Sequence, residues 1–290
     1  MFGRALDRTA AVRRVLRGLL VANIAVVAAK ATIGAFAGSL AVVGDAVHSS
    51  IDAVYNILGL IVIHLASRAP DEDHPYGHRK FETLGALGIC VVLVVTSFEL
   101  GRSAINRLVT GGHLIQLTDL GLALLLGTLA INVLVAWYEN RQGQLLQSEL
   151  LIADAAHTRT DVFITIGVLI GMIFSRQGHL WVDPAVAIAV ALLILRVAYQ
   201  ILRRVVPVLV DERAIPEPTI RTSAQAVEGV ISAYRIRSRG GTSGVRFAEV
   251  TIAVDPHANV ADAHAIADAV EERLKKDLEL EEVTVHVEPC

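Results

Sequence analysis

The residues in this sequence whose types and spacing fit metal chemistry occur as two matched His-Asp pairs. Residues 44–52 read GDAVHSSID and residues 153–161 read ADAAHTRTD, and both have the form small-Asp-Ala-x-His-x-x-x-Asp. In each, the histidine and the last aspartate are four residues apart, so on a helix they project from one face, one turn apart. Two imidazoles and two carboxylates make a ligand set that suits a tetrahedral divalent ion such as Zn²⁺. The predicted ligands are His48, Asp52, His157 and Asp161.

The chain that must position these pairs changes composition along its length. It has 290 residues, of which 53% are hydrophobic, and the apolar excess lies in long runs before about residue 205. This shift indicates a membrane domain at 1–207 followed by a water-exposed domain at 208–290. The net charge of −3 gives no basic character that would favour nucleic acid. The two cysteines offer neither a disulfide framework nor a Cys-x-x-Cys metal pair.

Six segments are apolar over the ~20 residues that a helix needs to cross a bilayer. Basic residues gather at the N-terminus and in the longer connections, which predicts that both termini are cytoplasmic in a multi-pass protein of the cell (inner) membrane. A signal peptide is the alternative for the N-terminus, but the apolar run is too long and lacks a clear cleavage site. The predicted spans are roughly residues 15–37, 40–66, 83–106, 117–139, 148–174 and 181–202.

Both His-Asp pairs fall near the middle of their predicted spans. His48 is ten residues past Gly38, and His157 is nine residues past Ser148. At a rise of ~1.5 Å per residue each histidine therefore lies ~15 Å deep, and the two helices run in opposite directions, so the pairs can meet. One alternative is that these polar residues do no more than form hydrogen bonds that hold helices together. Two matched ionisable pairs at one depth favour an ion path instead.

A second acidic residue repeats beside each pair. Asp45 and Asp154 stand three residues before each histidine and on roughly the same helix face. We expect them to be hydrogen-bonding partners of the ligands, proton acceptors or helix caps. Arg159 is two residues from His157, which turns it away from that face, and we predict it to be a counter-charge to Asp154.

After Pro207 the pattern predicts a small α+β domain. Residues 216–228 read as a short helix, and two alternating segments around a Gly-rich turn at 239–244 read as a β-hairpin. The apolar stripe in NVADAHAIADAVEERLKKDL predicts a second helix, and EVTVHVEP predicts a last strand. The expected element order is αββαβ.

Together these motifs resemble those of the cation diffusion facilitator family. The resemblance covers nearly the whole chain and rests on GDAVHSSID, DEDHPYGHRKFE, AHTRTD and the ending AHAIAD…VHVEP. It implies an all-α six-helix transporter bundle in the bilayer that forms homodimers, with a cytosolic, ferredoxin-like C-terminal domain similar to metallochaperones. The family exchanges divalent metal for protons by alternating access. His-x-x-x-Asp in both helices is typical of its zinc-type members, whereas manganese-type members tend to carry Asn or Asp in place of the histidines.

The resemblance also implies metal sites outside the membrane. Asp71, His74 and His78 match a second site in the loop at the cytoplasmic face, with a solvated charged loop as the alternative reading. Four residues of the C-terminal domain match positions for regulatory metals at the dimer interface, although Tyr234 and Thr251 stand where some members have histidines. A polar residue on a strand edge is the alternative for the histidine of the last strand. The four residues are Glu249, His264, His286 and Glu288.

The expected function is therefore efflux of a divalent metal cation, with Zn²⁺ as substrate and regulatory ligand, in exchange for protons. An enzyme is not expected, because a membrane metalloenzyme needs His-rich boxes or an open coordination position beside a nucleophile or base, and we find no candidate catalytic Ser, Cys or Glu at that depth. One alternative is a non-transporting partner or metal-sensor subunit. Another is an exporter of Co²⁺, Cd²⁺, Fe²⁺ or Ni²⁺, since geometry separates these ions more than affinity does.

Overall fold

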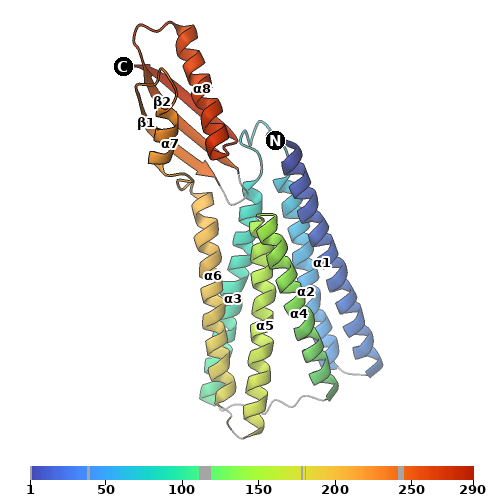
Figure 1. Ribbon diagram of the computed structural model, residues 1–290. Coiled ribbons are helices and arrows are strands. Elements are labelled where there is room, and N and C mark those ends of the chain that lie inside the picture. Colours follow the sequence, from blue (N-terminus) through green and yellow to red (C-terminus); the bar gives the residue numbers. More distant parts are fainter. Residues whose placement is uncertain (1, 38–39, 111–118, 178, 180, 241–244) are drawn as a thin grey trace. The chain divides into compact units, whose positions relative to one another are not determined.

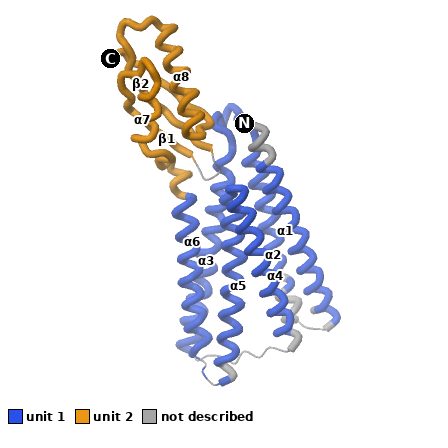
Figure 2. The backbone as a smooth tube through the Cα atoms, in the orientation of Figure 1, with its two compact units in different colours: residues 1–205 blue, residues 206–290 orange. Residues whose placement is uncertain are grey.

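The structure is a computed structural model that describes the chain except residues 1, 38–39, 111–118, 178, 180 and 241–244 (Figure 1). The chain divides into two compact units, Met1–Val205 and Val206–Cys290 (Figure 2). The first unit is helical, and the second combines helices with a sheet.

Long helices that run side by side make up the described part of the first unit (Figure 1). α1 packs on α2, α4 packs on α5, and α3 contacts both α2 and α5. Several helices extend beyond the predicted apolar runs, because the polar residues that flank those runs continue the helical conformation. The helices are α1 (Phe2–Ala37), α2 (Leu40–Ala66), α3 (Lys80–Thr110), α4 (Asp119–Leu145), α5 (Glu149–Arg176) and α6 (Val182–Leu209).

Five of these helices contain described stretches that are long and apolar enough to cross a bilayer, in α1, α3, α4, α5 and α6. The described part of α2 contributes a shorter apolar stretch, Asp52–Ala66, so the sixth span stays a prediction. Large apolar side chains on the helices are exposed, among them Val21 at 68%, Phe98 at 71% and Leu192 at 63%. Such surfaces are expected of helices that face lipid or a partner.

A close approach of α4 and α5 positions the polar residues on these two helices. A β-carbon on Gly143 would lie 2.9 Å from Ile152 Cγ1 and 3.0 Å from the Ile152 backbone nitrogen. Only glycine fits there without a shift of backbone. Ser148 then begins α5, because its Oγ accepts a hydrogen bond from the Leu151 N–H at 3.3 Å, in the manner of an N-cap.

The second unit has the predicted element order αββαβ, confirmed as α7 (Glu217–Gln225), β1 (Ser232–Gly240), β2 (Arg246–Val254), α8 (Val260–Leu278) and β3 (Glu282–Pro289). β1 pairs antiparallel with β2, and β2 pairs parallel with β3. The parallel pair is possible because α8 makes the crossover between its strands. Apolar side chains of the two helices and one face of the sheet form the core, with Ile220, Ile252, Val270 and Leu274 fully buried.

The first helix of this unit is shorter than the predicted 216–228. It ends at Gln225, with Ala226 as its C-cap. A little further on, Gly229 has φ +92°, a left-handed conformation that a helix cannot contain. The Gly-rich turn predicted at 239–244 lies mostly outside the described residues.

Candidate metal centre

Three of the four predicted membrane ligands lie together between α2 and α5. Asp52, His157 and Asp161 each offer one ligand atom, and these atoms all lie within 4.8 Å of one another. His157 Nε2 is 3.8 Å from Asp52 Oδ1. All three residues are half-buried, and the Tyr55 ring lies edge-on to the His157 ring, with 4.9 Å between ring centroids. Two carboxylates and an imidazole at this spacing form a group that could hold a divalent cation.

The helix register explains why these residues meet. Asp52 of α2 faces His157 of α5, and one turn further along α2, Asn56 Nδ2 donates to Asp154 Oδ2 at 3.3 Å. Residue numbers therefore increase along α2 in the direction in which they decrease along α5, so the two helices are antiparallel, as predicted. Asp161 joins the group because it follows His157 by one turn on the same face.

The fourth predicted ligand, His48, belongs to α2 by its backbone, one turn before Asp52. Its side chain lies outside the described residues, as does that of Asp45. Their roles stay predictions.

A buried polar network beside this group includes residues that the sequence analysis did not single out. Glu139 of α4 is 1% exposed, and its carboxylate accepts a hydrogen bond from Thr158 Oγ1 of α5 at 2.9 Å. Asn23 of α1 donates to Asn56 at 2.9 Å, and Asn56 in turn donates to the buried Asp154. The predicted span 117–139 ends at Glu139, but α4 continues to Leu145, and Glu139 is buried. In the sequence Glu139 is a charged residue at the end of an apolar run, and this pattern alone does not show that the residue is buried.

The predicted pairing of Arg159 with Asp154 is wrong. The Arg159 guanidinium donates to Asn140 Oδ1 of α4 at 3.3 Å, on the exposed side of the helices. Asp154 instead bonds Asn56 inside the bundle. The reason is the rotation about α5: residues 154 and 159 are too far around the helix to share a face.

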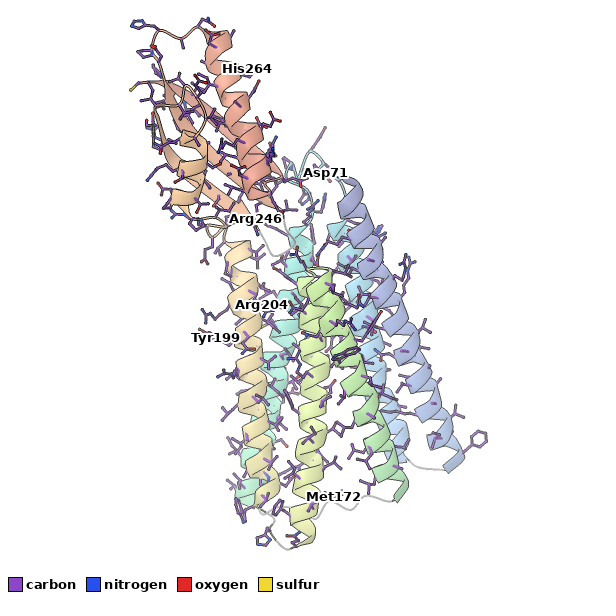
Figure 3. All side chains as sticks on the ribbon, in the orientation of Figure 1. Asp71, Met172, Tyr199, Arg204, Arg246 and His264 are labelled. Atoms are coloured by element: carbon purple, nitrogen blue, oxygen red, sulfur yellow. The ribbon has the colours of Figure 1, made fainter. Side chains whose placement is uncertain are left out.

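The second predicted site lies within one short turn between α2 and α3, where Figure 3 labels Asp71. His74 Nδ1 is 3.2 Å from Asp71 Oδ1, and His78 Nε2 is 3.3 Å from Asp71 Oδ2. Gly77, with φ +80°, turns the chain so that the two imidazoles lie side by side, 4.2 Å between ring centroids. The ligand atoms of all three residues lie within 4.8 Å of one another.

Two of the candidate ligands in this loop, Asp71 and His78, have ligand atoms that suit a cation. The His74 backbone N–H, which donates to Asp71 Oδ1 at 2.7 Å, lowers the pKa of that carboxyl and keeps it ionised. His78 is buried, and its Nδ1 has no hydrogen-bond partner among the described residues. A carboxylate with two imidazoles is a common ligand combination for Zn²⁺.

The four predicted ligands of the C-terminal domain do not form a comparable group within the described part of one chain. Thr251 pairs with His286 across β2 and β3, so by strand alternation Glu249, His286 and Glu288 share the open face of the sheet. His264 is on α8, exposed (Figure 3), and lies 3.7 Å from Asp268 of its own helix. A regulatory site that joins these residues therefore stays a prediction that needs a second chain.

Glu288 has structural partners of its own. Its carboxylate accepts a hydrogen bond from the Tyr234 hydroxyl and lies 3.0 Å from Arg235 Nη1 and 3.5 Å from His286 Nε2. The Tyr234 hydrogen bond, helped by the Arg235 charge, lowers the pKa of Glu288. The tyrosine at position 234 thus joins β1 to β3 across the central strand β2.

Tyr234→Phe is expected to speed amide exchange in β3 a few-fold at neutral pH, and this difference should fade below about pH 4. A carboxyl whose folded-state pKa is lowered stabilises the fold above the unfolded pKa, and the contribution is lost as pH falls through the folded pKa. Hydrogen exchange by mass spectrometry on the full chain, with both proteins compared at each pH, measures it. A difference that stays constant through acid would contradict the assignment.

Comparison with known proteins places two family profiles on the chain. The "Cation efflux transmembrane domain" matches residues 18–210, and the "Cation efflux protein, cytoplasmic domain" matches residues 215–290. A solved structure of MamM-CTD is 28% identical, covers 26% of this chain and 92% of its own, and has a TM-score of 0.24.

Individual relatives match along most of the chain. An uncharacterized transporter of Methanocaldococcus jannaschii is 31% identical and covers 93% of this chain and 95% of its own length. Metal tolerance protein C1 of Arabidopsis thaliana is 32% identical over 96% of this chain, which spans 62% of that plant protein. Manganese efflux system protein MneS of Bacillus subtilis is 27% identical and covers 93% of each chain.

Proposed function

The chain belongs to the cation efflux family, and from this premise we propose that it exports a divalent metal cation, Zn²⁺ first, in exchange for protons. The transporter would work as a homodimer in the cell membrane with both termini in the cytoplasm. Membership of a transporter family agrees with the expectation that the chain is not an enzyme. The zinc specificity, the proton coupling, the six spans and the domain boundary at 207 belong to the proposal.

The observation that carries the proposal is the group formed by Asp52, His157 and Asp161. Ionisable side chains within apolar spans are rare and mark ion or substrate paths. Here they come from two antiparallel helices, and their ligand atoms are close enough to share one cation. With His48 as the predicted fourth ligand, the set would be tetrahedral, the geometry that Zn²⁺ prefers.

Proton exchange follows from the chemistry of these ligands. A metal binds neutral imidazole and ionised carboxylate, so a bound cation and bound protons exclude each other. An unperturbed histidine side chain changes its charge near neutral pH, so the natural proton carriers would be His157 and the predicted ligand His48. A cation arriving from the cytoplasm would displace protons, and protons from the other side would displace the cation after the helices rearrange.

Manganese is the second candidate substrate. Two of the three described ligands are carboxylates, and oxygen ligands suit Mn²⁺. The manganese efflux system protein MneS is similar over nearly its whole length. We place Zn²⁺ first because the predicted fourth ligand, His48, would add a second nitrogen to the set.

The experiment that tests the proposal measures metal uptake into proteoliposomes that contain the purified full chain. With an imposed pH gradient, we expect Zn²⁺ or Mn²⁺ to accumulate against its own gradient while protons move the opposite way. Competition by Co²⁺, Cd²⁺, Fe²⁺ and Ni²⁺ then ranks the substrates. Metal binding without any flux would instead support a sensor or partner subunit.

Removal of the loop site should reduce metal binding without abolishing transport. His78→Ala is expected to lower the Zn²⁺ stoichiometry of the full chain by about one ion, because only one carboxylate and one imidazole would remain. Equilibrium dialysis with metal analysis measures the stoichiometry, with His257→Ala, an exposed histidine outside both groups, as control. An unchanged Zn²⁺ stoichiometry would contradict metal binding by this loop and favour the alternative, a solvated charged loop.

A further inference from the structure

Two polar bonds to neighbouring helices, one buried and one partly buried, hold α5 on either side of His157. On one side, Asn56 of α2 donates to Asp154 at 3.3 Å, one turn before the histidine. On the other, Thr158, the residue after the histidine, donates its hydroxyl to Glu139 of α4 at 2.9 Å. α5 is thus tied to both neighbouring helices within about one turn of a candidate ligand.

Glu139 is an unusual residue to find between packed helices of this kind. Its side chain is 1% exposed, and it lies in an α4 stretch that is long and apolar enough to cross a bilayer. A buried carboxyl there is costly unless it is satisfied, and residues of this kind are retained for function. Glu139 is not a member of either metal-capable group among the described residues, so it does not act as a ligand there.

The hydroxyl of Thr158 has two acceptors that define its direction. It donates to the Glu139 carboxylate and lies 3.2 Å from the Asp154 carbonyl oxygen of its own helix. Without Glu139, the hydroxyl would keep only the acceptor on its own helix, and α5 would lose its polar contact with the interior of α4. A small rotation of α5 would then carry His157 and Asp161 away from Asp52, since both sit on the same helix.

We propose that Glu139 is a positioning residue that, through Thr158, holds α5 in the rotation at which His157 and Asp161 meet Asp52. This inference rests on the proposed metal-transport function and names a residue that determines the affinity and choice of its substrate. Glu139 acts as a hydrogen-bond acceptor in this role, so its charge is not needed. Partners that orient metal ligands in this way typically contribute 10–100-fold to metal affinity.

The test compares four variants in the proteoliposome flux assay, with KM and kcat determined separately for Zn²⁺ and Mn²⁺. Glu139→Leu and Thr158→Val should each raise the KM for the transported ion about tenfold and change the Zn²⁺ to Mn²⁺ preference. Glu139→Gln should stay within about twofold of the wild type, because its amide oxygen still accepts from the threonine. The double variant of Glu139→Leu with Thr158→Val should be no worse than either single change.

A matched control exists one residue further along both helices. Asn140 and Arg159 also join α4 to α5 by a hydrogen bond, at 3.3 Å, but on the exposed side. Asn140→Leu breaks a contact between the same two helices, yet we expect it to leave the KM unchanged.

Three results would overturn the inference. The first is a Glu139→Gln variant as impaired as Glu139→Leu, which would mean that the charge or a proton on Glu139 is what matters. The second is full additivity of the two single changes, and the third is an unaltered KM in Glu139→Leu. If Glu139→Leu does not fold, Thr158→Val and Glu139→Gln decide by the same criteria. Absence of flux in the wild-type protein would instead refute the proposed function.

Discussion

Asp161→Asn is expected to lower the rate of metal transport about 100-fold or more while the protein stays folded. Asparagine keeps the size of the side chain but removes the negative charge that binds the cation. Asp161 is one of three residues whose ligand atoms lie within 4.8 Å of one another, so its loss leaves one imidazole and one carboxylate among the described ligands. The initial rate of Zn²⁺ or Mn²⁺ uptake per folded protein in proteoliposomes measures the effect.

The control for this prediction is Glu99→Gln, which makes the same chemical change at an exposed position of α3. It should transport like the wild type. Asp52→Asn should reproduce the loss, because Asp52 belongs to the same group from the other helix. Transport by Asp161→Asn within tenfold of the wild type would show that the cation passes elsewhere.

Arg8→Ala is expected to destabilise the first unit strongly, because Arg8 bonds groups from two other parts of this unit. The Arg8 guanidinium lies 3.0 Å from a carboxylate oxygen of Glu82, which is 5% exposed. It also donates to the backbone carbonyls of Leu146 and Gln147, at 2.7 and 2.9 Å, in the connection between α4 and α5. Ser148 Oγ donates to the same carboxylate at 2.5 Å, so the Glu82 carboxylate joins α3 to the start of α5.

Without Arg8, the buried Glu82 carboxylate keeps the hydrogen bond from Ser148 but loses its positive partner. The carbonyls of Leu146 and Gln147 lose the hydrogen bonds from the guanidinium. Breaking such a pair from one side costs about 3 kcal/mol, given that the arginine is partly exposed. A loss of this size lowers the unfolding midpoint by about 5–10 °C for a unit of this length. Thermal unfolding of the full chain in detergent measures the shift, and Arg14→Ala, an exposed arginine of α1, is the control.

The double variant Arg8→Met with Glu82→Gln separates the loss of the ion pair from the burial of an unpaired charge. Glutamine keeps the hydrogen bond from Ser148 and carries no charge, so the double variant should be more stable than Arg8→Ala alone. If the double variant is instead no more stable than Arg8→Ala, Arg8 stabilises the unit by its contacts with the carbonyls and not by its charge.

Local features of the candidate metal centre could be predicted from the amino-acid sequence alone. The spacing of His157 and Asp161 places both on one helix face whatever surrounds them, because the helical repeat is a property of the backbone. The alternation in β1 and β2 and the stripe in α8 identified the second unit's elements for the same reason. Asp71, His74 and His78 come together in one short turn, which needs no contact from distant parts of the chain.

Which helix faces meet depends instead on how the helices pack against one another. A helical repeat gives the face of a residue but not the rotation of its helix against a neighbour, so Arg159 turned out to bond Asn140 rather than Asp154. Burial of Glu139 depends on where α4 ends and how closely Gly143 lets α5 approach, and neither can be read from a charged residue beside an apolar run. Arg8 and Glu82 meet across 74 positions of chain. Such contacts follow from the packing of whole helices, which local spacing does not encode.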